Sequence, residues 1–283
     1  MSVKFLKAVN KLFPLPVHPF NLQNDGITTY AKWQYEKGEN TIKFYLDSPF
    51  VKDAKEMFSG KSVLDIGCGA CGKTMFYGKM GASHITGMDI VESYEKEACD
   101  LASELGISDI FTFVTGDAAK TDFPDESFDV IIMNDAMEHV ADPVGVLNEA
   151  YRILKKNGRL YVNFPPYNHP TGAHLSDAIG IPWVHLFFSE KTLIKAYKEL
   201  VSPLPDGENR INFRISKKED GTEYFSYINK MTLKRFRKIK KTVPFNILYY
   251  KEVPLRGFLT PLAKMPLLKE LFVKMAVCIF EKK

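Results

Sequence analysis

One short segment near residue 60 constrains the fold of this chain more than any other. Residues 62–74 read SVLDIGCGACGKT: an apolar strand runs into Asp65 and then into a G-x-G-x-x-G turn made by Gly67, Gly69 and Gly72. Glycines at this spacing permit a tight turn at the start of a helix. They also let the backbone approach a ligand without Cβ atoms in the way. The segment predicts a strand, a glycine-rich turn and a helix that cradle a ligand.

The charge of Asp65 distinguishes between the nucleotide cofactors that such a turn could hold. A carboxylate two residues before the first glycine would lie close to the pyrophosphate of a dinucleotide such as NAD and repel it. S-adenosylmethionine (SAM) instead brings an ammonium and a sulfonium group, which the carboxylate attracts directly or through water. The sign of this charge favours SAM, held by Asp65 and by the turn residues Gly67, Cys68, Gly69 and Gly72.

Later segments place polar residues at the ends of further strands. A second strand ends in Asp89, seventeen residues after Gly72, near the spacing at which a carboxylate accepts hydrogen bonds from ribose hydroxyls. A third strand ends at Asp117, whose carboxylate can accept from an adenine amino group while the neighbouring backbone meets the ring. The remaining cofactor contacts are therefore predicted at Asp89, Ile90, Asp117, Ala118 and Asn134.

Strand and helix signals alternate along the chain. Strands are predicted to begin at Ser62 and to span residues 84–90, 111–116, 128–134, 159–164, 245–251 and 272–280. Helices are predicted at residues 72–79, 92–104, 143–154 and 231–241, with Asn157 and Gly158 ending the third. Such alternation implies a parallel sheet with helices on both faces and a binding crevice at the carboxyl ends of the strands.

Together these motifs resemble the class I SAM-dependent methyltransferases, of the small-molecule type grouped with ubiquinone and menaquinone methyltransferases (methyltransferase type 11). The resemblance is carried by VLDIGCGACGKT (63–74), TGMDI (86–90) and the segments 115–143 and 149–165, in the expected order and spacing. It implies an α/β fold with a Rossmann-like seven-stranded sheet, mostly parallel with an antiparallel last strand. It further implies that the last two strands form a hairpin at the sheet edge.

Four regions follow from this reading. We expect an N-terminal helical extension over residues 1–61, a SAM-binding core over 62–165, a substrate cap inserted over 166–230, and residues 231–283 completing the sheet. Residues 203–224 mix charges with Pro and Gly and are expected to form a surface excursion or a loosely ordered lid. In the extension, Tyr30, Trp33 and Tyr35 are expected mainly in the core, with cofactor contact as the alternative.

The cap concentrates ring side chains where the substrate should enter. Three of the six histidines and one of the two tryptophans lie within seventeen residues, which predicts a pocket with aromatic walls and a few polar groups. Substrate contacts are expected from Glu138, His169, His174, Trp183 and His185. A metal site built from His169, His174, Asp177 and His185 has acceptable ligand types but no recognised spacing, so no metal is predicted.

His139 is the first candidate for a catalytic base, because it follows the fourth strand and an imidazole can remove a proton near neutral pH. The alternative is that His139 only shapes the cofactor site, as the occurrence of this histidine in relatives with unlike acceptors suggests. His174 and His185 are the rival bases. Glu138 and Asp135 could orient a histidine or bind a basic acceptor, or could belong to a solvated helix start.

Composition agrees with a water-soluble enzyme. The chain has 283 residues, 45% of them hydrophobic, and no apolar run reaches the ~18 residues of a membrane span. The first residues lack a long apolar core with a cleavage site, so we expect a cytoplasmic protein. A net charge of +4 and the basic residues of 230–241 and 253–274 allow peripheral contact with anionic lipid, against the simpler reading of a solvated helix face.

Two further readings are disfavoured. The C-x-x-C spacing of Cys68 and Cys71 is typical of redox motifs, but both residues lie inside the glycine turn. An RNA-binding module is not visible, and Asn-Asp-Ala-Met after the fourth strand differs from the Asn-Pro-Pro-Tyr type of motif used for base nitrogens.

The sequence thus predicts a SAM-dependent methyltransferase that acts on an O, C or N atom of a small or lipid-like acceptor and yields S-adenosylhomocysteine. The alternatives are a non-catalytic SAM-binding or nucleotide-binding protein, then an RNA methyltransferase or a redox enzyme on the same scaffold.

Overall fold

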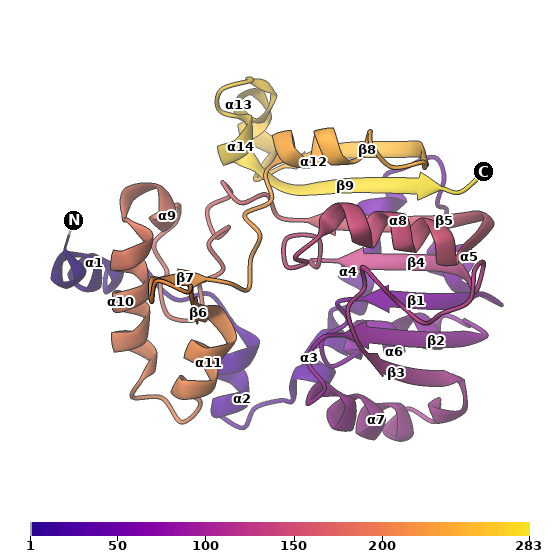
Figure 1. The fold of residues 1–283 in the computed structure, drawn as a ribbon, viewed down its shortest axis with the longest axis horizontal. Coiled ribbons are helices and arrows are strands. Elements are labelled where there is room, and N and C mark those ends of the chain that lie inside the picture. The colour runs from indigo at the N-terminus through magenta and orange to yellow at the C-terminus, as the bar shows by residue number, and fades with distance from the viewer. Residues whose placement is uncertain (1) are drawn as a thin grey trace.

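The computed structural model describes residues 2–283 and shows two lobes joined by several chain segments (Figure 1). The larger lobe contains a seven-stranded sheet in the order β3-β2-β1-β4-β5-β9-β8. Strands β1 to β5 are parallel, and β9 runs antiparallel to both of its neighbours. The predicted fold class is confirmed. The strands are β1 (Ser62–Ile66), β2 (His84–Asp89), β3 (Phe111–Thr115), β4 (Phe128–Asn134), β5 (Leu154–Phe164), β8 (Asn246–Pro254) and β9 (Val273–Glu281).

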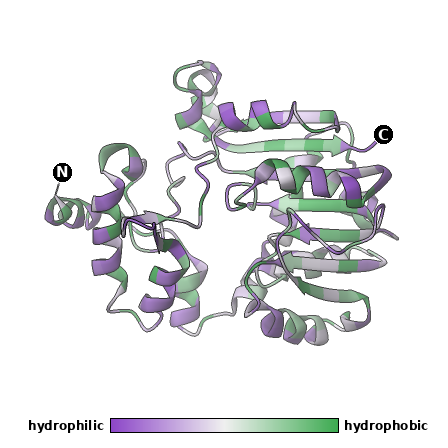
Figure 2. Ribbon diagram, viewed as in Figure 1, coloured by the Kyte–Doolittle hydropathy of each residue, from purple (hydrophilic) through white to green (hydrophobic). Residues whose placement is uncertain are grey.

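Helices cover both faces of this sheet, because successive side chains of a strand point to opposite faces and apolar side chains lie on both. In β4, Ile131 and Met133 pack with α8 (Pro143–Ile153) and α12 (Leu233–Ile239). Val130 and Ile132 point the other way into a second core. The strands are correspondingly among the most hydrophobic parts of the ribbon (Figure 2). The second core is closed by α3 (Tyr30–Glu36), α4 (Gly38–Leu46), α5 (Ala54–Phe58), α6 (Gly72–Lys79) and α7 (Tyr94–Glu104).

The smaller lobe has an apolar core of its own. Leu6 of the N-terminal helix is fully buried there against Ile194 and Tyr197, which lie on the longest helix of this lobe. The N-terminal extension is therefore shared between the lobes, while the domain boundaries themselves stay a prediction. The elements of the smaller lobe are α1 (Val3–Asn10), α2 (Pro19–Asn24), α9 (Val184–Phe187), α10 (Glu190–Val201), α11 (Gly207–Arg214) and the hairpin β6 (Ile215–Lys217) with β7 (Glu223–Phe225).

Two local predictions were wrong. Residues 203–224 are not a loose lid, because α11 buries Arg210 and Arg214 against the carboxylate of Asp177. Helix α8 ends at Ile153, and β5 starts before the Asn-Gly pair, with a register shift between its first and later pairs with β4.

Short elements complete the edge of the sheet. Between β8 and β9 lie α13 (Thr260–Lys264) and α14 (Lys269–Phe272), together with a 3-10 turn at Gly257–Leu259. A further 3-10 turn, Ser108–Ile110, precedes β3. Over residues 2–283, no helix combines the length and the apolar character needed to cross a membrane.

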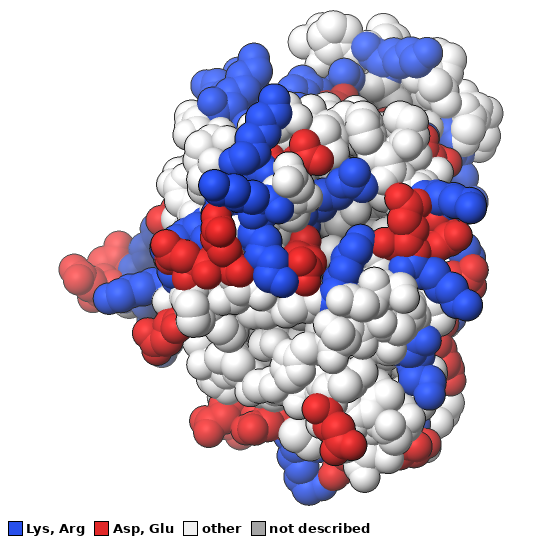
Figure 3. Space-filling model, turned by 90° about the vertical axis from the view of Figure 1, so that its right-hand side faces the viewer, with Lys and Arg blue, Asp and Glu red and all other residues white. Residues whose placement is uncertain are grey.

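Charges of both signs are interleaved on the face in Figure 3, where Lys and Arg gather in the upper half with Asp and Glu among them. Within the predicted basic run, Lys230 forms an ion pair with Glu190 at 3.1 Å. Lys240 places its ammonium 3.5 Å from the centre of the Tyr250 ring. Part of the positive charge is thus compensated within the protein, and membrane contact by this region stays a prediction.

Gly72 should be required for stability as well as for the shape of the glycine turn. A Cβ atom there would overlap the carbonyl oxygen of Ala31 and lie 2.5 Å from the Tyr35 nitrogen, because α3 packs directly on α6. We expect Gly72→Ala to cost about 2 kcal/mol and to lower the thermal midpoint by about 4–8 °C. Gly257→Ala is the matched control, since no atom lies within 4 Å of its added Cβ. Equal midpoints for the two variants would contradict the tight α3–α6 contact.

Candidate active site

The glycine turn between β1 and α6 lies at the carboxyl ends of the parallel strands, on the side that faces the smaller lobe (Figure 1). Gly67 and Gly69 adopt positive φ angles of 72° and 56°, which strongly favour glycine. A Cβ on Gly67 would lie 2.6 Å from the Cβ of Ala136, in the segment after β4. The turn and the segment after β4 therefore meet where the strand order reverses between β1 and β4, the usual ligand crevice of such sheets.

Most of the backbone donors of this turn are already in use. A loop that binds a pyrophosphate does so with free N–H groups, which form a nest for the anion. Here five N–H groups have acceptors within the protein: Gly67 and Cys68 donate to Met88 O, Gly69 to Asp89 Oδ2, Cys71 to Cys68 O and Gly72 to Gln34 Oε1. The turn is consequently poorly equipped for a dinucleotide, as the charge of Asp65 predicted.

Asp65 is buried, with 3% of its surface exposed, and accepts a hydrogen bond from Thr74 Oγ1 at 2.7 Å. Burial raises the pKa of this carboxyl group to about 7, although the bond from Thr74 opposes the change. The group is poised to become fully charged when a cation arrives beside it.

The other predicted cofactor residues cluster at neighbouring strand ends. Asp89 holds the turn through Gly69 N at 2.8 Å and accepts from Val91 N through its other oxygen. Ile90, beside it, is 77% exposed, and Asp117 is exposed at the end of the adjacent strand. Asn134 is buried and accepts from Asn163 Nδ2 at 2.8 Å. Ala118 packs at the edge of the core next to Asp117.

A cavity of about 250 Å³ opens between the lobes next to this cluster. Tyr30 and Tyr94, whose ring centres are 5.7 Å apart, form its wall on the side of the glycine turn. The smaller lobe supplies the opposite wall. The full lining is His18, Pro19, Phe20, Tyr30, Tyr94, His139, Pro165, Thr171, His174, Ser176, Phe213, Arg214 and Tyr227.

His139 enters this cavity from the turn after β4. Its Nδ1 atom lies 2.6 Å from the carbonyl oxygen of Tyr227, and the side chain keeps 35% exposure. The carbonyl can only accept, so Nδ1 carries the proton and Nε2 keeps its lone pair. Desolvation by the cavity walls lowers the pKa of His139, so the ring is neutral at pH 7. Asn229 fixes the same turn by donating to Met137 O and Val140 O.

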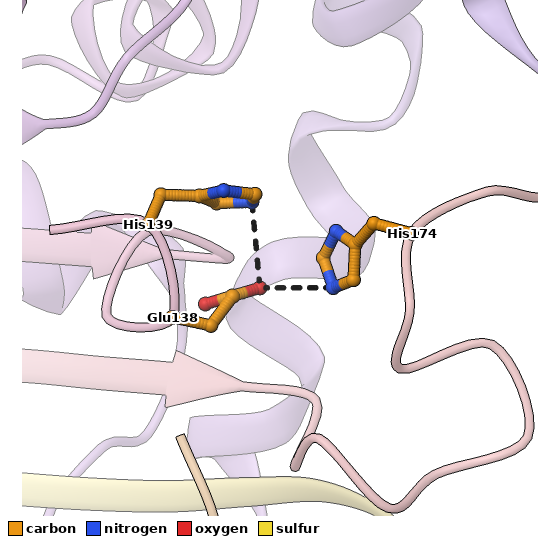
Figure 4. Close-up of side chains that lie close together, drawn as sticks. All are labelled: Glu138, His139 and His174. Carbon is orange, nitrogen blue, oxygen red and sulfur yellow. Dashed lines mark ion pairs between the residues drawn. The ribbon is translucent and has the colours of Figure 1, made fainter. Parts of the chain in front are cut away.

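Glu138 and His174 lie next to His139. The carboxylate oxygen Oε1 of Glu138 is 3.9 Å from Nε2 of His139 and 3.8 Å from Nε2 of His174 (Figure 4). Burial raises the pKa of Glu138 and lowers that of His174. Two of the residues predicted to contact substrate are therefore brought together with the predicted base.

Three other predicted contacts do not line this cavity. His169 bonds Thr171 through Nδ1, the ring of Trp183 packs 6.0 Å from that of Phe272, and His185 packs against Tyr167. Their role in substrate binding stays a prediction. The four-residue metal set is not assembled either, because Asp177 is engaged by Tyr197, Arg210 and Arg214.

Arg214 connects the cavity to the interior of the smaller lobe. Its guanidinium pairs with Asp177 Oδ1 at 3.1 Å and lies over the rings of Phe20, Tyr197 and Tyr227, 5.1 to 5.3 Å from their centres. Only 3% of its side chain is exposed. This residue, like His18, Phe20, Tyr94 and Tyr227, was missed by the sequence analysis, because nothing in the local sequence indicates contact between such distant segments.

Gln34 was also missed, although it lies beside the predicted aromatic candidates. Its side chain donates to Cys68 O and accepts from Gly72 N, bridging both ends of the turn. Gln34 is buried. Its place between the aromatic residues Trp33 and Tyr35 is the sequence signal that could have indicated it. Among its neighbours, the Tyr30 ring lies over Gly69, 3.1 Å from the position that a Cβ atom on Gly69 would take.

The sulfur atoms of Cys68 and Cys71 lie 3.1 Å apart, buried behind Gly87.

Comparison with known proteins identifies the central segment. Residues 64–162 match the family model of the methyltransferase domain. This segment is similar to a methyltransferase domain. The resemblance drawn from the motifs is confirmed for that segment, which includes the glycine turn, Asp89 and His139.

Two curated relatives match this methyltransferase domain. The sterol 24-C-methyltransferase of Gibberella zeae is 39% identical over 99 residues, which cover 35% of this chain and 26% of that protein. The ubiquinone biosynthesis O-methyltransferase of Pseudomonas entomophila is 31% identical over 132 residues, 47% of this chain and 55% of that protein. The match thus spans about a quarter to a half of the relatives' length.

A solved structure extends the likeness beyond the domain. A SAM-dependent methyltransferase from Methanosarcina mazei superimposes with a TM-score of 0.52 over 80% of this chain and 95% of that chain, at 20% identity. This likeness concerns the fold alone.

Proposed function

We propose that this protein is a SAM-dependent methyltransferase that transfers a methyl group to a small acceptor held between the two lobes. The observation that carries the proposal is the closed glycine turn. Five of its N–H groups are paired within the protein, and its neighbours are the carboxylates Asp65 and Asp89. Such a turn suits a cofactor that presents hydroxyl groups and cations rather than phosphates.

Each part of SAM has a group of suitable chemistry at this edge of the sheet. Asp65 supports the ammonium end, and the remaining lone pairs of the Asp89 carboxylate accept from the ribose hydroxyls. The exposed Ile90 offers an apolar surface for the adenine ring, and Asp117 accepts from its amino group. The full set assigned to the cofactor is Asp65, Gly67, Cys68, Gly69, Gly72, Asp89, Ile90, Asp117, Ala118 and Asn134.

The cavity supports a small acceptor with a ring. Its volume of about 250 Å³ lies just below the usual range for drug-sized ligands, and aromatic side chains dominate its walls. The ring of a phenol or a quinol head group suits these walls, whereas the tail of a lipid-like acceptor would have to extend outside. Glu138 and His174 are assigned to the part of the acceptor inside the cavity, and His169, Trp183 and His185 to the part that extends outside it.

Methyl transfer requires alignment and, for a protonated acceptor atom, a base. Bound SAM supplies a methyl group attached to a positively charged sulfur, and the leaving group is a neutral thioether. We assign the base to His139, whose neutral Nε2 faces the cavity while Tyr227 O fixes the tautomer. The rings of Tyr30 and Tyr94 exclude water on the side of the glycine turn.

Cofactor identity is the first test of this proposal. Calorimetric titration with SAM, S-adenosylhomocysteine and NADH should show binding of the first two and none of the third. Asp89→Ala should weaken SAM binding at least tenfold, because the ribose loses its acceptor. Asp100→Ala is the matched control, since that carboxylate is exposed and pairs only with Lys96 among the described contacts. Tight binding of NADH without SAM would revive the redox reading.

The affinity for SAM should depend on pH through Asp65. Its pKa is about 7 in the free protein, and a neighbouring ammonium must lower it, so binding expels a proton. We expect the affinity to rise from pH 6 to about pH 7.5 and the binding enthalpy to vary with the ionisation enthalpy of the buffer. Asp65→Asn should bind more weakly and lose both dependences. An unchanged pH profile in this variant would place Asp65 outside the cofactor site.

The role of His139 can be tested once an acceptor is found. A panel of quinols, phenols and lipids is screened by release of S-adenosylhomocysteine. His139→Ala should then lower kcat by about 10²- to 10⁴-fold while the Kd for SAM stays within about twofold. His84→Ala, at the start of β2, is the matched control. Unchanged kcat in His139→Ala would remove the base assignment, and SAM binding without transfer to any acceptor would favour the non-catalytic alternative.

A further inference from the structure

Glu138 is a buried carboxylate whose side chain is 4% exposed. Neither of its oxygens has a hydrogen-bond partner within residues 2–283. Leaving a buried carboxylate without a donor is costly, and such groups are normally paired or coordinate a metal. A buried carboxyl group of this kind either holds a proton or faces a cation, and the described residues around Glu138 supply no cation.

Two imidazole nitrogens lie beside this carboxylate. Nε2 of His139 lies 3.9 Å from Oε1 and, with its proton on Nδ1, has a lone pair there. Nε2 of His174 lies 3.8 Å from the same oxygen on the other side. One ligand atom from each of the three residues lies within 4.8 Å of the others (Figure 4). Three such atoms face one another without a hydrogen bond between them.

The protein holds these side chains in place from behind. Tyr227 O accepts from Nδ1 of His139, which is the second-shell arrangement usual for a metal-bound histidine. His174 is held at a φ of 53°, a conformation that is uncommon for residues other than glycine. The hydroxyl of Tyr227 donates to the carbonyl oxygen of His174 and stabilises that turn. One residue of the smaller lobe thus positions both imidazoles.

We propose that Glu138, His139 and His174 bind one divalent transition-metal ion, of the kind represented by Zn²⁺ and Co²⁺. Mixed imidazole and carboxylate ligands suit these ions, whereas Mg²⁺ and Ca²⁺ prefer oxygen ligands. Around a tetrahedral ion with bonds of about 2.1 Å, ligand atoms are about 3.4 Å apart. The observed separations of 3.8 and 3.9 Å are wider by about half an ångström, which small side-chain rotations can close.

Three protein ligands leave a further coordination position, and His139 and His174 both line the cavity. This part of the inference rests on the proposed function, because the open position would take an oxygen of the methyl acceptor. An acceptor hydroxyl bound to the ion would lose its proton to water. A lone pair on the resulting acceptor oxygen would form the bond to the methyl carbon. The pair of the broken carbon–sulfur bond would return to sulfur. Nε2 of His139 then acts as a ligand instead of a base.

The site is tested first by metal binding alone. The purified full chain is freed of metal with a chelator and titrated with Zn²⁺, without SAM or acceptor, so that failure here leaves the cofactor tests untouched. We expect one Zn²⁺ per chain. Glu138→Gln and His174→Asn should each weaken binding at least 100-fold, and asparagine is chosen because it tolerates the positive φ of His174. His84→Asn is the matched control and should bind as the unchanged protein does.

Co²⁺ distinguishes this site from adventitious binding to cysteine. A histidine and carboxylate site gives visible d–d bands without a thiolate charge-transfer band in the near ultraviolet. Those visible bands should disappear in Glu138→Gln, which is nearly isosteric and keeps the test valid even if His174→Asn fails to fold. Absence of stoichiometric binding, binding that persists in both variants, or a thiolate band would each overturn the proposal.

The rate of methyl transfer then distinguishes the two roles of His139, metal ligand and direct base. If the ion acts on the acceptor, methyl transfer should fall at least tenfold in chelator and return with Zn²⁺ or Co²⁺, while SAM binding is unchanged. Full activity in chelator would overturn the role of the ion in the reaction and leave His139 as a direct base.

Discussion

The contacts around the glycine turn are the constraint on which the rest of the structure depends. Asp89 holds Gly69 from β2, Gln34 holds both ends of the turn from α3, and Ala136 touches Gly67 from the segment after β4. A Cβ atom on Gly67 would lie 2.6 Å from that of Ala136, and one on Gly72 would lie 2.6 Å from that of Gln34. Because three separate segments converge there, the turn also fixes where α3 and the segment after β4 can lie.

A second constraint holds the smaller lobe in shape. Asp177 is buried between Arg210 and Arg214, and a buried charge of this kind is tolerated only when its partners are present. Arg214 extends from this cluster into the cavity, where it meets the ring of Tyr227. Tyr227 in turn holds His139 and His174. The interior of the smaller lobe is thereby connected, contact by contact, to the proposed reaction centre.

How much could be predicted differs between the two lobes. The strands of the sheet were found to within a few residues, except that β5 begins at Leu154 rather than Arg159. Their alternating or continuous apolar runs are local signals. The segment over 203–224 was predicted to be a surface excursion or a loosely ordered lid because it mixes charges with Pro and Gly, yet Arg210 and Arg214 are buried against Asp177, more than thirty residues away in the chain. Local composition contains no information on such a partner.

The sequence by itself determined the parallel sheet, the glycine turn and the carboxylates beside it, because a repeating strand and helix pattern implies parallel strands and charge selects among ligands at short range. The tertiary structure decided which histidines matter. His139 and His174 are thirty-five residues apart in sequence and 5.0 Å apart between ring centres, whereas His169 and His185 lie elsewhere. Only the packing of the smaller lobe against the turn after β4 brings His139 and His174 together over Glu138. Which side chains meet depends on contacts between segments far apart in the chain, and no local sequence pattern encodes such contacts.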